Sequence, residues 1–159
     1  MSDRAQALAD TFGAAHDETV KTVKGIPDDR WSARCADDER TAGVVAHHVA
    51  GSYESTFGIA QLGASGQPLP QVSWDMIHDR NAQHAAEKGN CTKEETLALL
   101  REGGERTNSG IAGMSDEQLD QTLVLPLFGP DEMTVEQLID RLVIGHVSMH
   151  LPSLKGAVA

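Results

Sequence analysis

Two histidines on the last predicted helix, His146 and His150, are four positions apart. Residues four apart lie one above the other on a helix, so both imidazoles could bind one metal ion. They also continue an apolar stripe of that helix, formed by Val135, Ile139 and Leu142 at spacings of three and four. The pair should therefore face the interior, where an imidazole nitrogen needs a partner. That partner is either a metal ion or a neighbouring hydrogen-bonding group, and the pair alone leaves both open.

A third imidazole could come from an earlier helix, where His47 and His48 are adjacent. Successive residues of a helix are about 100° apart, so only one of the two can face the core. His48 shares its face with apolar Val45, so we expect His48 to point inward and His47 to be partly exposed. On the first helix, His16 shares a face with Phe12, which makes it a rival ligand or a residue that lines the pocket.

The two remaining histidines, His78 and His84, lie among charged and amide residues, so we expect them to be solvated and assign them no role. The predicted metal ligands are His48, His146 and His150, with no further catalytic residue. Three neutral imidazoles leave coordination positions open, as in reactive rather than structural sites. Zinc is the first choice of metal, and nickel or another first-row ion is the second.

Such an open site supports two kinds of chemistry, and the residues alone do not choose between them. The metal can bind a low-molecular-weight thiol as the thiolate, or it can activate water for hydrolysis. Because metal-bound imidazoles must be neutral, we expect the ion to be released as the pH falls through about 6.5. No convincing general base accompanies the histidines in the sequence.

Several familiar catalytic motifs are missing, which narrows the function classes. Val147 follows His146, so the His-Glu-x-x-His motif of zinc proteases lacks its glutamate base. The sequence has no glycine-rich nucleotide loop and no Gly-x-Ser-x-Gly nucleophile elbow. The Glu-x-x-His pairs of di-iron bundles are missing as well.

The composition fits one globular domain over residues 1–159. The chain is 40% hydrophobic and 23% charged, so it can bury a core without disulfides or metals. With 13 Lys and Arg against 24 Asp and Glu, its formal net charge is −11, which argues against nucleic-acid binding. We see no membrane span or signal peptide. Cys35 and Cys91 are expected to be free thiols in a reducing compartment, the cytoplasm.

Helices must position the histidines, because most of the sequence has helical periodicity. A hydroxyl residue followed three positions later by Glu or Gln, as at Thr92 and Thr134, predicts a helix start. The polar stretch 28–40 is predicted to be a loop that Trp31 anchors in the core, and 121–127 holds a weak hint of strand. The fold class is all-α, a four-helix bundle with four or five main helices and short extra turns. The main helices are expected over 3–24, 41–63, 74–88, 92–112 and 134–154.

The residues around these motifs resemble the DinB-like superfamily, which includes thiol-dependent S-transferases and the N-terminal domain of mycothiol-dependent maleylpyruvate isomerases. The similarity rests on Trp31, on Thr41–Ala50 and on Thr134–His150 with its terminal His-x-x-x-His. In that family a histidine about two turns into the second helix completes a three-ligand site, and His48 occupies this position. The isomerase branch has an acidic residue where this chain has His146, so the resemblance favours the all-histidine branch.

The resemblance implies a metal-dependent S-transferase that activates mycothiol or a similar thiol to attack an electrophile. It also implies a homodimer whose partners are these small molecules, while the charge and hydropathy described above argue against nucleic acid and membrane as partners. The alternatives are a non-catalytic dimeric module for stress response or small-molecule binding, and a metal-dependent hydrolase or isomerase.

Overall fold

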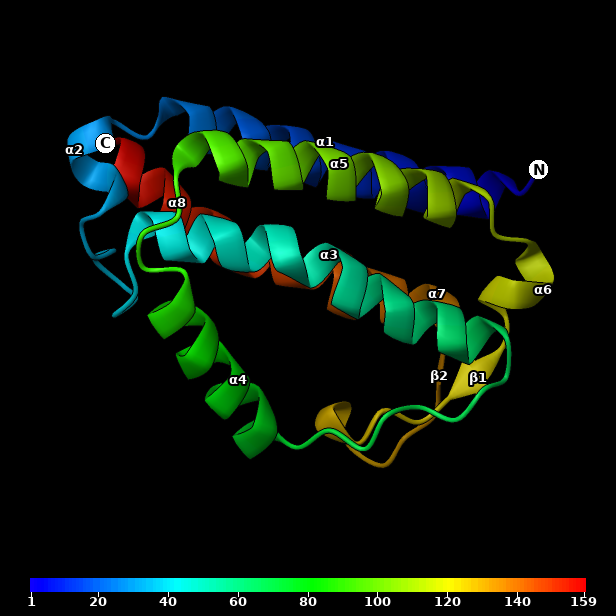
Figure 1. Cartoon of the computed structure of the whole chain (residues 1–159). Coiled ribbons are helices and arrows are strands. Elements are labelled where there is room, and N and C mark those ends of the chain that lie inside the picture. The colour runs from blue at the N-terminus through cyan, green and yellow to red at the C-terminus, as the bar shows by residue number, and fades with distance from the viewer.

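Four long helices form the bundle in the computed structural model, which describes residues 1–159. Helices α1 (Asp3–Gly25) and α5 (Lys93–Ala112) lie side by side as one layer (Figure 1). The other layer contains α3 (Ala42–Ala64) and the C-terminal helix. Each layer packs on the other, since α3 contacts α5 and α1 contacts the C-terminal helix. The predicted four-helix bundle is confirmed.

Hydroxyl side chains begin the long helices where the sequence predicted. The Thr41 hydroxyl accepts a hydrogen bond from the Val44 backbone N–H and so begins α3. Thr92 and Thr134 each form a complete capping box with the residue three positions later. These bonds satisfy backbone donors that the first turn of a helix leaves free.

The C-terminal helix departs from the unbroken α-helix expected over 134–154. It consists of α7 (Val135–Leu138), a π-helical segment η2 (Ile139–Ile144) and α8 (Gly145–Val158). The wider turn is closed by a hydrogen bond from the Gly145 N–H to the Asp140 carbonyl, five residues back. Such π-segments are frequent at functional sites, and this one ends two residues before His146.

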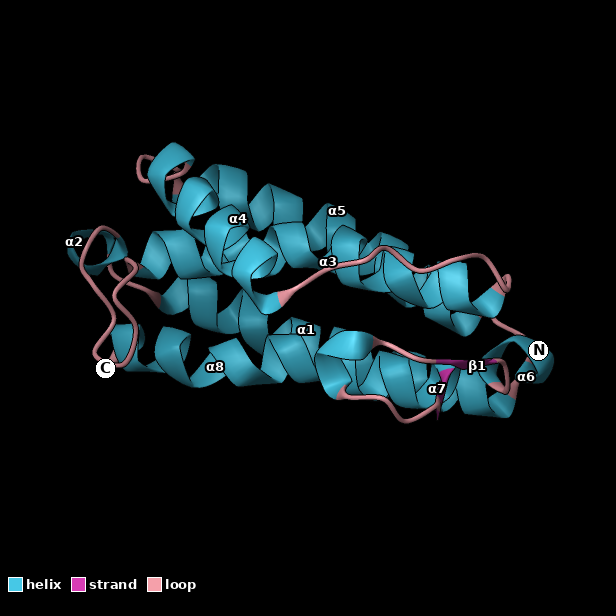
Figure 2. Ribbon diagram, turned by 90° about the horizontal axis from the view of Figure 1, so that it is seen from below, coloured by secondary structure: helices cyan, strands magenta, loops and turns pink.

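Shorter elements connect the long helices. The stretch expected to be a loop after residue 27 begins with a short helix, α2 (Asp28–Trp31), and α6 (Asp116–Leu119) follows α5. Strands β1 (Thr122–Leu123) and β2 (Met133–Thr134) pair antiparallel, with the 3-10 turn η1 (Pro126–Phe128) between them. The hint of strand over 121–127 is thus confirmed for two residues, at the end of the bundle where the N-terminus lies (Figure 2).

Helix α4 (Trp74–Glu87) is the exception to the parallel arrangement. It diverges from the axis of α3 (Figure 1), and none of its residues is buried. The hydroxyl of Ser73, the residue before α4, accepts a hydrogen bond from the Met76 backbone N–H and so caps the first turn of the helix. Packing on the core therefore does little to hold α4 in place.

The core is one cluster of 28 buried apolar residues contributed by all four long helices. Trp31 anchors α2 in it, as predicted, and its indole N–H donates to the Cys91 carbonyl at 2.8 Å. The indole lies directly against the backbone of Gly43, where a Cβ atom would be 2.7 Å from the ring. None of the helices combines the length and apolar character needed to cross a lipid bilayer.

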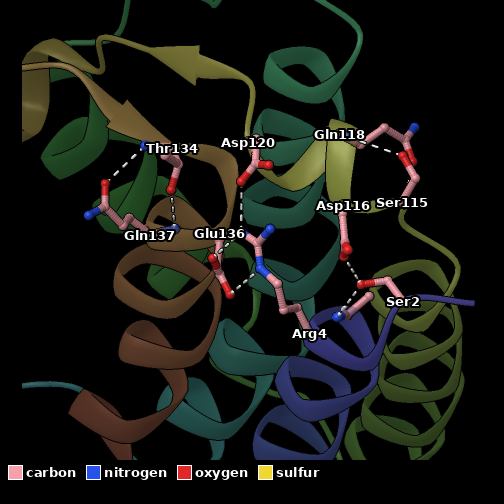
Figure 3. A network of polar contacts seen from close by, with 10 residues as sticks. Ser2, Arg4, Ser115, Asp116, Gln118, Asp120, Thr134, Glu136 and Gln137 are labelled. Atoms are coloured by element: carbon pink, nitrogen blue, oxygen red, sulfur yellow. Dashed lines mark hydrogen bonds and ion pairs between the residues drawn. The ribbon is translucent and has the colours of Figure 1, made fainter.

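A polar network holds the N-terminal end of the bundle together (Figure 3). Nη2 of Arg4 on α1 lies 2.8 Å from an Asp120 carboxylate oxygen and 2.5 Å from one of Glu136. Ser2 caps α1 and also donates to Asp116. The network joins the first helix to α6 and α7, and the C-terminus lies at the opposite end of the bundle (Figure 1).

Candidate metal centre

Three histidines from two helices converge on one point between α3 and α8. The ligand atoms offered by His48, His146 and His150 all lie within 4.8 Å of one another. His48 Nε2 and His146 Nε2 are 3.0 Å apart, and the three ring centroids are separated by 4.6 to 5.0 Å. The structure therefore brings together the three residues that helical spacing had selected.

Local structure explains this convergence. The Thr41 cap fixes where α3 begins, and His48 lies two turns further along, on the face that contacts α8. The π-segment ends at Ile144, two residues before His146, so it sets the direction in which His146 and His150 project from the C-terminal helix. Of the predicted apolar stripe, Val135, Ile139 and His150 are buried, whereas Leu142 and His146 are half-buried, and Val143 is the buried residue of the π-segment one turn after Ile139.

Burial keeps the three imidazoles neutral. It lowers the pKa of His48 to about 3 and that of His146 to about 4, with smaller contributions from neighbouring imidazoles and from Arg40. Burial is also the main cause that lowers the pKa of His150. Neutral imidazoles offer lone pairs to a metal, and because their pKa values are lowered, protons compete for them only well below the expected pH of about 6.5.

These residues fit a first-row divalent ion. Imidazole suits zinc, nickel and their neighbours, and the hydrogen bond between His48 and His146 shows that two ring nitrogens already point at each other. Nδ1 of His146 is buried without a hydrogen-bond partner. A buried ring nitrogen without a hydrogen-bond partner lowers the free energy of unfolding, and such unpaired groups often mark functional sites.

A charged loop ahead of α3 reaches the same site, and sequence reasoning missed it. Arg40 binds Asp38 through two nitrogens, Nε at 2.9 Å and Nη2 at 2.6 Å, and this pairing lowers the pKa of the Asp38 carboxyl. Asp37 accepts a hydrogen bond from Ser153, one turn after His150. The only signal in the sequence was a run of charges just before the Thr41 cap.

Two histidines without a predicted role form a second pair beside the centre. Nδ1 of His47 and Nε2 of His84 are 2.9 Å apart, and the ring centroids of His48 and His84 are separated by 5.8 Å. The prediction that His84 is solvated was wrong, because α4 places its Nδ1 in a buried position. His47 is partly exposed and His78 is exposed, both as expected.

His16 is not a rival ligand. Its Nδ1 lies 2.8 Å from the Tyr53 hydroxyl, and burial lowers its pKa. The ring lines a groove of about 930 Å³ between α1 and α5, and Gly104 leaves room for it. The alternative role of His16, as a residue that lines a pocket, is the one that the structure supports.

The bundle and the histidine cluster define a helical protein with a candidate three-histidine metal centre. The chain belongs to the DinB superfamily, whose family model matches residues 11–152.

Two solved structures share the fold. One is an uncharacterized protein from Clostridium difficile 630, with a TM-score of 0.75 and 12% sequence identity over 98% of this chain and 95% of that one. The other is described as "Sibling Lethal Factor Precursor - DfsB", with a TM-score of 0.71 and 16% identity over the same shares. At this identity the likeness concerns the fold. No curated protein gives a significant match to the sequence.

Proposed function

We propose that the protein is a metal-dependent thiol S-transferase, with His48, His146 and His150 as the ligands of zinc, nickel or another first-row divalent ion. The observation that supports this is the meeting of three neutral imidazoles from α3 and α8. When bound, such an ion lowers the pKa of a thiol and favours the nucleophilic thiolate. Three protein ligands leave room for that thiol.

The protein residues contribute to the reaction in two ways. Burial keeps the three imidazoles neutral, as the lowered pKa values indicate. Arg40, which is paired with Asp38, acts as a positive charge on all three rings, and a positive charge favours an anion such as a thiolate. The thiol gives its proton to solvent, its sulfur forms a bond to an electrophilic carbon, and the leaving group departs with the bonding electron pair.

The thiol is supplied from outside the chain. The cysteines Cys35 and Cys91 are both free, and burial raises their pKa values, so they are weak nucleophiles at neutral pH. A low-molecular-weight thiol such as mycothiol is therefore the proposed co-substrate, with a small electrophile as the acceptor. Free thiols of this kind suit the cytoplasm, where we place the reaction, and we propose a homodimer as the working form.

Metal analysis and a thiol-consumption assay test this function. After desalting, we expect about one tightly held ion per chain, and its loss in His48→Ala and in His150→Ala. The exposed His78→Ala is the matched control and should keep the ion. Metal-loaded protein should consume one member of a panel of cellular thiols, mycothiol included, in the presence of an electrophile.

Two results would contradict the proposal in different ways. Full metal content in both ligand variants would show that the three histidines do not hold the ion. A metal-loaded protein that consumes no thiol beyond the metal-stripped control would remove the transferase activity and support a non-catalytic binding module.

A further inference from the structure

The pair formed by His47 and His84 has the geometry of two metal ligands. Two nitrogens bound to one ion at about 2.0–2.1 Å lie about 2.9–3.4 Å apart for octahedral to tetrahedral angles. Nδ1 of His47 and Nε2 of His84 are 2.9 Å apart, where without an ion they form a hydrogen bond. The rings come from different helices, 37 positions apart in sequence, so their meeting reflects how α4 is placed and not local helix geometry.

His84 is also unusual for a residue of α4. Only two buried side-chain nitrogen or oxygen atoms in the chain lack a hydrogen-bond partner, and they are Nδ1 of His84 and Nδ1 of His146. His146 belongs to the candidate three-histidine centre, whereas His84 does not. Nδ1 points away from the Nε2 that faces His47, so the unpaired atom shows that protein encloses this ring and is not itself the ligand atom of the pair.

The charges around the pair are mixed. Glu95 at the start of α5 acts on His47, and Glu87 on α4 acts on His84. These two carboxylates offset part of the charge of a bound dication. Lys88 opposes them at both rings, and Arg40 opposes them at His84. Because Arg40 also acts on the three rings of the first centre, the number of imidazoles, two instead of three, is the main reason to expect weaker binding here.

We propose that His47 and His84 form a second, weaker site for a first-row divalent ion, which clips α4 to α3. Helix α4 buries none of its residues and diverges from the bundle (Figure 1). An ion bound by both histidines would hold α4 against α3, which the few buried contacts of α4 do not do. Solvent water completes the coordination, because the pair supplies two ligands.

Titration of metal-stripped protein with Zn²⁺ at about pH 7.5, where imidazoles are neutral, tests the second site. The wild type should bind two ions, the second at least about tenfold more weakly. His84→Ala and His47→Ala should each bind one, while the control His78→Ala should bind two. The double variant His146→Ala/His150→Ala leaves one imidazole at the first centre. It should lose the tight ion and keep the weak one, so failure of the three-histidine centre remains distinguishable from failure of this site.

Hydrogen exchange of α4 provides a second readout. The second equivalent of Zn²⁺ should slow exchange of α4 amides in the wild type and leave it unchanged in His84→Ala. A wild type that binds a single ion, or a His84→Ala variant that still binds two, would overturn the site. Binding of two ions without slower exchange in α4 would overturn the clip.

Discussion

At the scale of single residues, protonation controls what this cluster of imidazoles can do. Six of the seven histidines have lowered pKa values, each chiefly because of burial. His78 is exposed and is the one histidine outside any polar contact or cluster described above. An acidic protein thus keeps a set of neutral imidazoles, and this favours cation binding at neutral pH.

Metal-free protein should lose stability on acidification between about pH 6.5 and 5. His48 and His146 have pKa values of about 3 and 4 in the folded state, against about 6.5 in the unfolded chain. The unfolded chain therefore takes up protons first, so the contribution is fully present above about pH 6.5 and falls below it. Urea unfolding of EDTA-treated protein at a series of pH values measures this slope.

The His146→Gln variant is the control. It removes one histidine with a lowered pKa, so its free energy of unfolding should depend less steeply on pH. The pH series stays above pH 5 so that Asp38 does not affect the slope. Because the pKa of Asp38 is lowered in the folded state, its contribution to the free energy of unfolding is lost only in more acidic solution. A free energy of unfolding that stays constant from pH 7 to 5 would contradict the expectation.

At the scale of elements, helix starts that depend on hydrogen bonds within one turn could be predicted from the sequence, whereas features that depend on packing between helices could not. The starts of α3 and α5 follow from hydroxyl caps at Thr41 and Thr92, whose bonds stay within one turn. The π-segment Ile139–Ile144 has no such local signal. The same holds for His84, whose partner depends on the angle at which α4 leaves the bundle.

The candidate centre was predictable because it depends on helical spacing within two helices. His146 and His150 share a face whatever the packing, and the phase of α3 follows from its cap, which places His48. The contribution of Arg40 was not predictable, since it comes from a loop whose path the sequence does not specify.

Replacing each of two glycines of α3 with alanine should change the stability of the protein in opposite directions. At Gly43 the new Cβ would lie 2.7 Å from the Trp31 indole, which is held by its bond to Cys91. We expect Gly43→Ala to destabilise the protein by about 1–3 kcal/mol, less the gain in helix propensity. At Gly51 nothing lies within 4 Å, so Gly51→Ala should stabilise by about 0.5–1 kcal/mol.

Chemical unfolding of both variants, followed by tryptophan fluorescence, measures the difference. Gly51→Ala serves as the matched control because it changes the same residue type in the same helix. Equal stabilisation by both substitutions would show that Trp31 moves aside at no cost, contrary to the packing described.

At the scale of the whole molecule, repulsion between acidic groups opposes folding. The formal net charge is −11, with 24 acidic against 13 basic residues. The cross-bundle ion pairs of Arg4 are partly exposed, with 39% of its side chain accessible. Exposed pairs of this kind add little stability, so net repulsion should be the larger long-range effect.

Added salt should therefore raise the thermal midpoint of the metal-free protein. Raising NaCl from about 20 to about 300 mM shortens the Debye length severalfold and screens the repulsion. Differential scanning calorimetry at fixed pH measures the midpoint, and Arg4→Ala separates the two effects, since salt should raise its midpoint at least as much. A midpoint that falls with salt would mean that local ion pairs dominate.

The placement of the two chain ends has a practical consequence for purification. The C-terminus lies near α2, at the end of the bundle where α3 begins and His48 is found (Figure 1). A polyhistidine tag fused there would bring additional imidazoles close to the centre and compete for the same ion. Fused at the N-terminus, at the opposite end of the bundle, the tag would lie farther from the centre (Figure 1). Metal stoichiometry is best measured on N-terminally tagged or tag-free protein.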